Sequence, residues 1–238
     1  TFSSSENGTI IFISGNCSTE NSHAVLESNT VTLNTLKDGR YKNCTLRVID
    51  SAGNASDNLS ITSFTVDTEL PRLAFLYPAD GSTNVSSGTK IILGFSESID
   101  NSTLTANTDN NTCFGSLQVS SDNFSTCIRM TSSGEKSSDS EFTFSPSDNL
   151  SSNNTYLIKI TSAIKDSSGN NLSSDNTTEN GFITADNIAP LLKEIIRIPV
   201  KTNDNTPDII FYTTEAGSVS VSGSCLSEAT EANSGNNT

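Results

Sequence analysis

The chain contains one stretch of sequence twice, once near each end. Residues 2–30 read FSSSENGTIIFISGNCSTENSHAVLESNT and residues 211–238 read FYTTEAGSVSVSGSCLSEATEANSGNNT. With Ile13 treated as a single insertion, ten of 28 aligned positions are identical, including one cysteine and two glycines. A repeat of this kind predicts a tandem array with a period of about 208 residues. We therefore expect the chain to begin part-way through one module and to end part-way through the next copy of it.

The composition and its patterning favour strands. Hydrophobic residues make up 33% of the 238 residues, which is low for a globular protein. They nevertheless gather in short alternating runs, such as GTIIFIS at residues 8–14 and EFTF at residues 141–144. Alternation with a period of two is typical of a half-buried strand. The sequence therefore predicts an all-β chain and argues against disorder.

The charge and the hydropathy exclude two classes of partner. The formal net charge is −14, and nucleic-acid affinity comes largely from Lys and Arg that contact phosphates. No apolar run approaches the ~18 residues that a membrane-spanning helix needs. We therefore expect neither nucleic-acid binding nor membrane insertion in this segment. The acidity itself is explained by solubility and mutual repulsion, with attraction of divalent cations as the alternative.

Cysteine spacing predicts two local disulfides. The five cysteines form no CxxC pair, and with a single histidine in the chain they do not suit a zinc site: Cys17, Cys44, Cys113, Cys127 and Cys225. Disulfides in an oxidising, extracellular compartment explain them better. In the repeat alignment Cys225 corresponds to Cys17, and the counterpart of Cys44 falls beyond residue 238. We therefore expect the bonds Cys17–Cys44 and Cys113–Cys127, with Cys225 left without a partner.

The linkers divide the chain into three predicted parts. Short segments with proline, TELPR at residues 68–72 and ADNIAP at residues 185–190, separate stretches of alternating sequence. We expect a C-terminal part of a module at residues 1–69, a complete module at 70–187 and an N-terminal part at 188–238. Within the first part we expect a strand in residues 24–36. Within the middle module we expect a hairpin of residues 114–120 and 124–130, clamped by Cys113–Cys127.

Two parts of the chain share a second signature. Tyr41 precedes the turn DSAGN (residues 50–54) by nine residues, and Tyr156 precedes DSSGN (residues 166–170) by ten. A tyrosine that opens the penultimate strand is typical of immunoglobulin-like sandwiches. With PADGSTNVSSGTKIILGFSESID at residues 78–100, the middle module resembles the bacterial Ig-like domain common in S-layer and large surface proteins. The flanking parts resemble a second bacterial Ig-like repeat type, through DGRYKNC, DSAGN and TNDNTP.

The resemblance implies a fold and a location. It implies tandem Ig-like β-sandwiches, joined by short linkers that contain proline, in a protein of the bacterial cell surface. The resemblance does not identify a ligand, because such modules mostly serve as spacers. The Cys113–Cys127 insertion lies outside the general family pattern, so we treat it as a local specialisation.

The expected function is structural. No GxSxG, HExxH or P-loop spacing occurs, and the position of His23 holds Glu231 in the second copy. We therefore expect no catalytic residues, and a structural segment of a long extracellular stalk or filament. The partners would be further copies of the same repeat, forming a rigid, disulfide-stapled array. The alternative is an adhesin that binds a glycan or a protein through loops such as the Cys113–Cys127 hairpin.

Calcium is the one cofactor that the sequence suggests. Asp67 and Asp186 each lie four residues before a proline at a predicted boundary. Calcium takes six to eight oxygen ligands, and acidic boundaries in extracellular arrays supply them. The competing explanation is that aspartate and proline simply make short, extended linkers. The turns DSAGN and DSSGN are open to the same two readings, and turn chemistry suffices for both.

Glycosylation is predicted at four asparagines. Fourteen Asn-x-Ser/Thr sequons occur in the chain. Four of them lie at or beside predicted hairpin tips, where a glycan has room: Asn54, Asn58, Asn171 and Asn176. The same residue pattern also suits turns, which is the alternative explanation.

Overall fold

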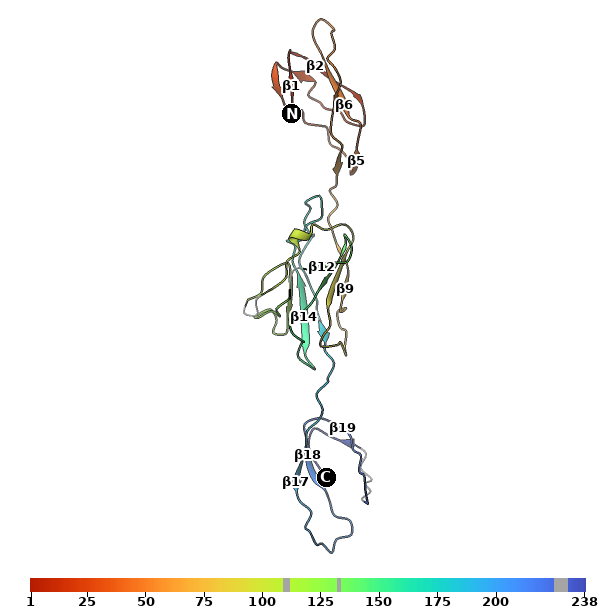
Figure 1. Ribbon diagram of the computed structural model, residues 1–238, viewed down its shortest axis with the longest axis vertical. Helices are drawn as coiled ribbons and strands as arrows, with labels where there is room; N and C mark the ends of the chain where they lie inside the picture. The colour runs from red at the N-terminus through yellow and green to blue at the C-terminus, as the bar shows by residue number, and fades with distance from the viewer. Residues whose placement is uncertain (109–111, 132–133, 225–230) are drawn as a thin grey trace. The chain divides into compact units, whose positions relative to one another are not determined.

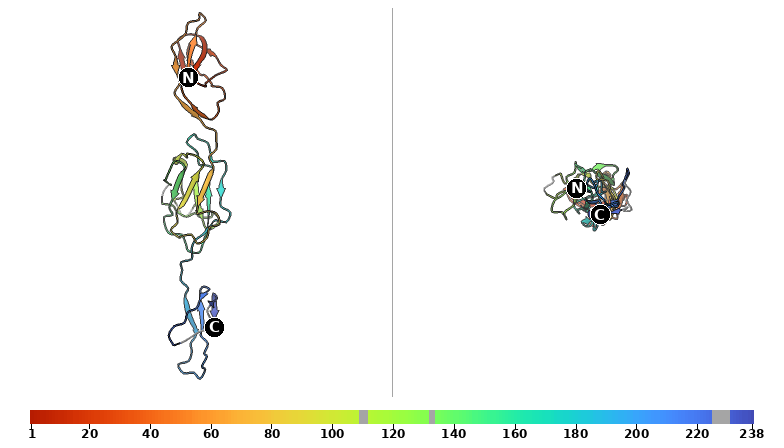
Figure 2. Two further views of the ribbon diagram at one scale, coloured as in Figure 1. Left: turned by 90° about the vertical axis from the view of Figure 1, so that its right-hand side faces the viewer. Right: turned by 90° about the horizontal axis from the view of Figure 1, so that it is seen from below.

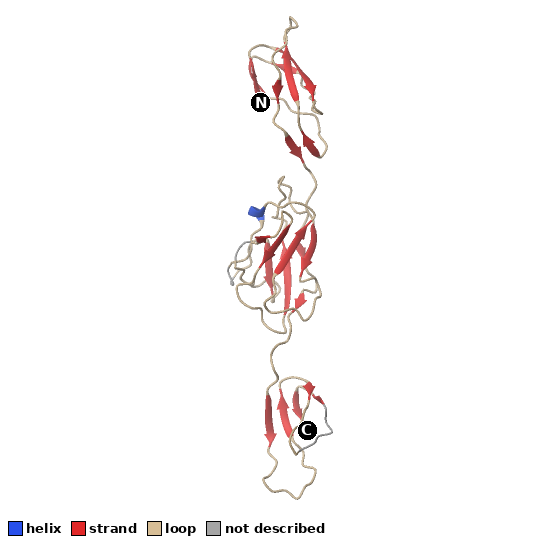
Figure 3. Cartoon of the chain, turned by 45° about the vertical axis from the view of Figure 1, so that its right-hand side comes forward, coloured by secondary structure: helices blue, strands red, loops and turns tan. Residues whose placement is uncertain are grey.

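The protein is all-β, as the alternating sequence predicts. The computed structural model describes residues 1–108, 112–131, 134–224 and 231–238. Within these ranges the only helix is a single 3-10 turn, η1 (Asn101–Thr103), and every other element is a strand (Figure 3). The chain divides into two compact units, Thr1–Thr184 and Ala185–Thr238.

Two antiparallel sheets form the larger part of the first unit (Figure 1). One sheet has the order β12-β13-β10-β9 and consists of β9 (Leu73–Tyr77), β10 (Ile91–Phe95), β12 (Glu135–Lys136) and β13 (Glu141–Phe144). The other is built on β14 (Thr155–Ile160), which pairs with β11 (Leu117–Ser120), β15 (Asn176–Thr177) and β16 (Phe182–Ile183).

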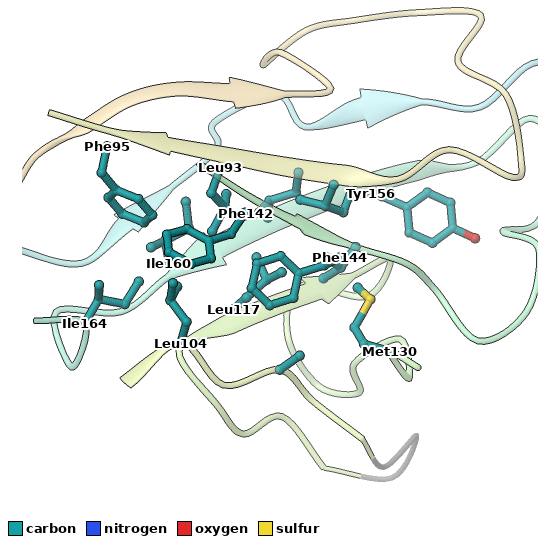
Figure 4. Packing of buried hydrophobic residues seen from close by; sticks show 14 of the residues in the cluster. Leu93, Phe95, Leu104, Leu117, Met130, Phe142, Phe144, Tyr156, Ile160 and Ile164 are labelled. Atoms are coloured by element: carbon teal, nitrogen blue, oxygen red, sulfur yellow. The ribbon is translucent and has the colours of Figure 1, made fainter. Parts of the chain in front are cut away.

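The two sheets are held together by alternating apolar side chains. Strand β13 buries Phe142 and Phe144, and β14 buries Tyr156, Ile158 and Ile160. These side chains belong to one continuous cluster (Figure 4). Within it the rings of Phe142 and Phe95 pack edge to face, with their centroids 6.3 Å apart. Burying a side chain of this size contributes about 1.5–3 kcal/mol. The period of two in the sequence therefore becomes a β-sandwich with its own core.

The N-terminal part of the first unit is built from smaller sheets. They comprise the pair β1 (Phe2–Ser4) and β4 (Glu27–Asn29), the sheet of β3 (His23–Ala24), β2 (Gly8–Ser14), β6 (Thr45–Ile49) and β7 (Leu59–Ser60), and the pair β5 (Gly39–Tyr41) and β8 (Phe64–Val66). Their fully buried apolar residues are few: Ile10, Ala24 and Leu46.

The strand expected in residues 24–36 is wrong for most of its length. Only the pairs at 23–24 and 27–29 are strands, and residues 30–38 form none. The Thr19 hydroxyl donates to the Thr32 carbonyl at 2.7 Å, and the Asn34 amide donates to the Ser18 carbonyl at 2.8 Å. These bonds attach residues 32–34 to the loop that contains Ser18 and Thr19. Val31, in the same segment, still packs against the core of Ile10, Ala24 and Leu46.

Two disulfides are present, Cys17–Cys44 and Cys113–Cys127, with sequence separations of 27 and 14. The first ties the loop after β2 to the residue before β6. Cys225 lies outside the described residues.

The expected hairpin of residues 114–120 and 124–130 is wrong. Strand β11 pairs with β14 instead, with Leu117 opposite Ile160. Residues 124–130 form no strand and meet β11 through one backbone–backbone bond, from the Ile128 amide to the Val119 carbonyl at 2.7 Å, and through the Phe124 amide, which donates to the Ser120 hydroxyl at 2.9 Å. Asn123 and Phe124 both have positive φ, 57° and 62°, which breaks the extended conformation that a strand needs.

The second unit is an open sheet with a separate hairpin. Strand β18 (Ile210–Thr213) lies between β17 (Leu192–Ile196) and β21 (Gly235–Asn237), and β19 (Gly217–Ser218) pairs with β20 (Glu231–Ala232) (Figure 2). Among the residues described in this unit, only Thr213 and Ala232 are buried. The described residues of this unit therefore form almost no apolar core.

The duplicated sequence folds into duplicated structure. Phe2 pairs with Asn29 and Ser4 with Glu27, while their counterparts pair in the same register, Phe211 with Asn237 and Thr213 with Gly235. Gly8 opposite Ala24 is likewise matched by Gly217 opposite Ala232.

The side-chain bonds of the repeat are duplicated too. The Asn29 amide oxygen accepts from Val25 and its nitrogen donates back to the Val25 carbonyl, both at 2.8 Å. Asn237 makes the same two bonds with Asn233 at the same distances. The two copies of the repeated sequence therefore share both strand register and side-chain hydrogen bonds.

Gly181→Ala is expected to destabilise the sandwich strongly. Gly181 has φ of +67°, and a Cβ there would collide with the carbonyl oxygen of Tyr156 on β14. Gly169→Ala is the matched control, because Gly169 has φ of +98° but nothing within 4 Å of its Cβ position. Urea unfolding should show that the free energy of unfolding falls by about 1–2 kcal/mol in the control and by about 3 kcal/mol or more in Gly181→Ala. Equal losses would mean that the close approach at Gly181 is absent.

Candidate functional site

The hydroxyl groups of both signature tyrosines, Tyr41 and Tyr156, hydrogen bond to the backbone. The Tyr41 hydroxyl donates to the Lys37 carbonyl at 2.9 Å. The Tyr156 hydroxyl accepts from the Ser151 amide at 2.9 Å, and its ring is buried. Hydrogen bonds to backbone a few residues upstream are what corner tyrosines of Ig-like sandwiches make. These rings are therefore structural.

The two DSxGN turns are built by the same bonds. The Asp50 Oδ1 accepts from the Ala52 and Asn54 amides, both at 2.8 Å, and its Oδ2 accepts from the Asn54 side chain at 2.9 Å. Asp166 repeats all three bonds within its own turn, each at 2.8 Å. The pKa of Asp50 is lowered, chiefly by the Asn54 side chain. Burial opposes ionisation of Asp166, but its hydrogen bonds still hold its pKa below the ordinary value.

Three carboxylates that follow three different strands converge beside the linker at residues 68–72. Asp67 follows β8, Glu97 follows β10 and Asp166 follows β14, and they can offer oxygens within 4.8 Å of one another. Asp67 is fixed there by the DSSGN turn: its Oδ2 accepts from the Ser168 hydroxyl at 3.0 Å, and its carbonyl accepts from the Asn170 amide at 3.1 Å.

The pKa of Glu97 is raised above its ordinary value. Burial is the largest cause, followed by the negative charges of Asp67 and Asp166 and a smaller effect of Glu69. Both effects disfavour the charged form of a carboxyl group. The Glu97 carboxylate therefore costs the folded state free energy at neutral pH unless a cation compensates it.

The oxygen ligands suit a hard cation such as calcium. Three carboxylates supply part of the six to eight oxygens that calcium takes. Asp186 has a different setting: its Oδ1 accepts from the Ile188 amide at 3.1 Å, and it joins no such cluster among the described residues. Calcium at Asp67 and at Asp186 stays a prediction. Sequence reasoning missed Glu97, because no local pattern brings residue 97 to residue 67.

The predicted glycosylation asparagines are all exposed: Asn54, Asn58, Asn171 and Asn176. Two of their side chains hold backbone geometry. Asn54 bonds to Asp50 as described above, and the Asn171 amide donates to the Ser162 carbonyl at 2.9 Å. Turn chemistry therefore accounts for Asn54, and Asn171 ties its segment to residue 162; glycosylation at the four stays a prediction.

His23 lies exposed on β3, paired with Thr9 of β2. No helix of the described residues is both long and apolar enough to cross a membrane.

Glu97→Gln is expected to raise the melting temperature at pH 7 in chelator. Because the folded-state pKa of Glu97 is raised, its destabilising effect grows as pH rises through that pKa and is absent at lower pH, where the carboxyl is protonated. Thermal unfolding should show a gain of about 2 °C at pH 7 and none at pH 3.5. Glu179 is exposed, so Glu179→Gln is the control and should leave the melting temperature unchanged at both pH values.

Excess calcium separates the two explanations of the cluster. If calcium binds, the melting temperature of the wild type rises in calcium and Glu97→Gln loses most of that rise. If the wild type melts at the same temperature in calcium and in chelator, the calcium prediction is wrong. A lower melting temperature for Glu97→Gln in chelator would contradict the raised pKa.

Comparison with known protein families gives a match for the middle of the chain. The family described as bacterial Ig-like domain matches residues 67–184, just under half of the chain. A comparison with curated proteins gave no match.

Solved structures of S-layer proteins are among the matches to the chain. The N-terminal part of the bacterial S-layer protein SbsC aligns with 15% identity and a TM-score of 0.35, over 69% of this chain and 38% of that one. Domains 1-6 of surface layer protein SbsC give the same identity and TM-score, over 69% of this chain and 22% of that one. This chain thus spans well under half of the length of these proteins, and a likeness of this size assigns no function. The family match covers the two-sheet sandwich with its corner tyrosine, so residues 67–184 are similar to the bacterial Ig-like domain family in both sequence and architecture.

Proposed function

We propose that this chain is a structural segment of a long extracellular protein of the bacterial surface, such as a stalk, a surface layer or a filament. The observation that carries the proposal is the duplication, in which one sequence takes the same strand register near both ends of the chain. Repeated modules of this kind build extended arrays whose stability is a sum over neighbours. The partners are further copies of the same repeat.

Local covalent bonds and short linkers support a mechanical role. Each disulfide closes a loop inside one part of the chain, which contributes on the order of 3 kcal/mol in the loop-entropy description. Disulfides also fit an extracellular location. Linkers that contain proline resist bending more than linkers rich in glycine. We accordingly assign the chain no catalytic activity, and Pro71 and Pro190 the role of stiffening the array.

Pro190→Gly is expected to loosen the linker at residues 185–190. Dye pairs on exposed sites in residues 67–184 and 191–238 would report the distance distribution by single-molecule energy transfer. The wild type should give a narrow distribution and Pro190→Gly a broader one, because glycine admits many more backbone conformations. Pro199→Gly, an exposed proline outside the linker, is the control. Equally broad distributions for wild type and variant would contradict a stiffening linker.

An adhesin is the second candidate, and one observation favours it. Phe114, next to the Cys113–Cys127 disulfide, is 42% exposed. The loop after β11 is held in shape by Asp122, which accepts from the Thr126 amide at 2.9 Å and from the Ser120 hydroxyl at 2.8 Å. The Cys113–Cys127 bond joins the segment that carries Phe114 to the end of this loop. An exposed aromatic ring next to a braced loop suits recognition of a glycan or protein. Wild-type chain that binds nothing on a glycan array or on cells would exclude this candidate.

A further inference from the structure

Two segments from opposite ends of the sandwich at residues 67–184 are bonded directly to each other. Residues 80–85 follow β9, the first strand of the sandwich, and residues 181–184 contain β16, its last strand. The two segments run parallel and meet at a bridge between Val85 and Thr184. Three backbone bonds join them: Gly81 amide to Gly181 carbonyl at 2.5 Å, Ile183 amide to Ser82 carbonyl at 2.7 Å, and Val85 amide to Ile183 carbonyl at 3.0 Å. We call residues 80–85 and 181–184 together the parallel clamp.

One carboxylate reinforces the parallel clamp. Asp80 accepts hydrogen bonds from three successive backbone amides, those of Glu179 at 3.2 Å, Asn180 at 2.9 Å and Gly181 at 2.6 Å. Hydrogen bonds to an ionised carboxylate are roughly twice as strong as those between neutral groups. Burial raises the pKa of Asp80, but the bonds from these amides outweigh burial and hold that pKa below its ordinary value. Asp80 is therefore charged at neutral pH, and its bonds to residues 179–181 are of the stronger kind.

The last residue of the clamp is also held on its other side. Thr184 is buried, and its hydroxyl donates to the Ser151 carbonyl at 2.6 Å and accepts from the Asn154 amide at 3.0 Å. The Thr184 amide donates in turn to the Asn154 carbonyl at 3.0 Å. The chain thus passes from the sandwich into the linker at residues 185–190 at a point that side-chain and backbone bonds hold in place.

The parallel direction of the clamp decides how it responds to tension. The chain enters residues 80–85 from the N-terminal linker and leaves residues 181–184 toward the C-terminal linker. A pull on the two linkers therefore draws the two segments along each other in opposite directions. Bonds across a pair that slides in this way are loaded together, whereas an antiparallel pair pulled at one end loses its bonds one after another. A parallel clamp consequently resists a pull along the chain better than a hairpin with the same number of bonds.

Strand β9 lies between the N-terminal linker and the clamp. Among the described strands it pairs with β10 alone, and its inward side chains Leu73 and Leu76 are only partly buried. Val85, at the far end of the clamp, belongs to the buried core itself. Release of β9 therefore leaves most of the core closed, whereas release of the clamp opens it.

We propose that the sandwich at residues 67–184 bears tension along the chain, and that the parallel clamp with Asp80 sets its resistance to unfolding under force. The biological purpose of this resistance rests on the structural role proposed above, but the position of the resisting bonds follows from the topology alone. Forced unfolding is governed by the rate of unfolding. Bonds that are intact in the folded state and broken in the transition state slow that rate. The bonds of Asp80 to residues 179–181 are assigned to this class.

Constant-force spectroscopy on the full chain, held at its two ends, tests the clamp. Unfolding of residues 67–184 is recognised by a gain in contour length of about 350 Å, because each released residue adds up to ~3.6 Å and the Cys113–Cys127 bond, with a sequence separation of 14, keeps its loop closed. Asp80→Ala should unfold about tenfold faster than the wild type at the same force, because three bonds to a carboxylate are lost.

Asp100→Ala is the matched control. The Asp100 carboxylate also accepts from a backbone amide, that of Ser102 at 2.9 Å, but Ser102 lies two residues away, so this bond joins no distant segments. The unfolding rate of Asp100→Ala under force should differ from that of the wild type by less than about twofold. Asp80→Asn keeps the size of the side chain and one acceptor oxygen, and should unfold at a rate between those of the wild type and Asp80→Ala. Amide hydrogen exchange at β10 and β14 checks that each variant keeps its sandwich.

Two results would overturn the proposal. One is an equal unfolding rate under force for the wild type, Asp80→Ala and Asp80→Asn. The other is equal acceleration by Asp80→Ala and Asp100→Ala, because the loss would then reflect general destabilisation and not the clamp. Failure of the structural role proposed above would be seen differently, as absence of the chain from the surface of intact cells, and it would leave the rates under force unchanged.

Discussion

The structure depends on one constraint, which is that the apolar face of the duplicated hairpin must be covered by a further strand. In the first unit β6 does this: it completes the ladder on β2 and places Leu46 in contact with Ile10 and Ala24. The Cys17–Cys44 bond fastens that strand to the loop of the hairpin. In the second unit the same hairpin keeps its register, and the described residues place no further strand beside β19. The register is therefore a local property of the repeat, whereas the core is a property of the completed module.

The sandwich at residues 67–184 is different, because it contains both of its sheets. Phe142 and Phe144 on one sheet face Tyr156 and Ile158 on the other, so each apolar surface is buried by the same domain. Its entry is fixed at Asp67, which hydrogen bonds to the DSSGN turn. That bonding places Asp67 beside Glu97, so the turn that organises the boundary also creates the cluster of carboxylates.

The sequence predicts those parts of the fold that depend on neighbours along the chain. Alternation predicts the strand at residues 8–14, and the DSxGN turns follow from Asp, Gly and Asn at fixed spacing. The disulfide partners could be chosen because the repeat shows which cysteine is duplicated. Features that depend on distant residues were missed. The pairing of β11 with β14 rather than with residues 124–130, and the approach of Glu97 to Asp67, are set by the sandwich as a whole.

The central claim is that the two copies of the repeat share one backbone register, and that strand β6 covers the apolar face of the first copy. Amide hydrogen exchange on the intact chain tests this most directly, by comparing residues 10–12 with residues 219–221. The account predicts slow exchange in the first copy, where β6 pairs with β2 and covers it, and exchange about a hundredfold faster in the second, where the described residues pair β19 with β20 alone. Equal protection of the two segments would contradict it.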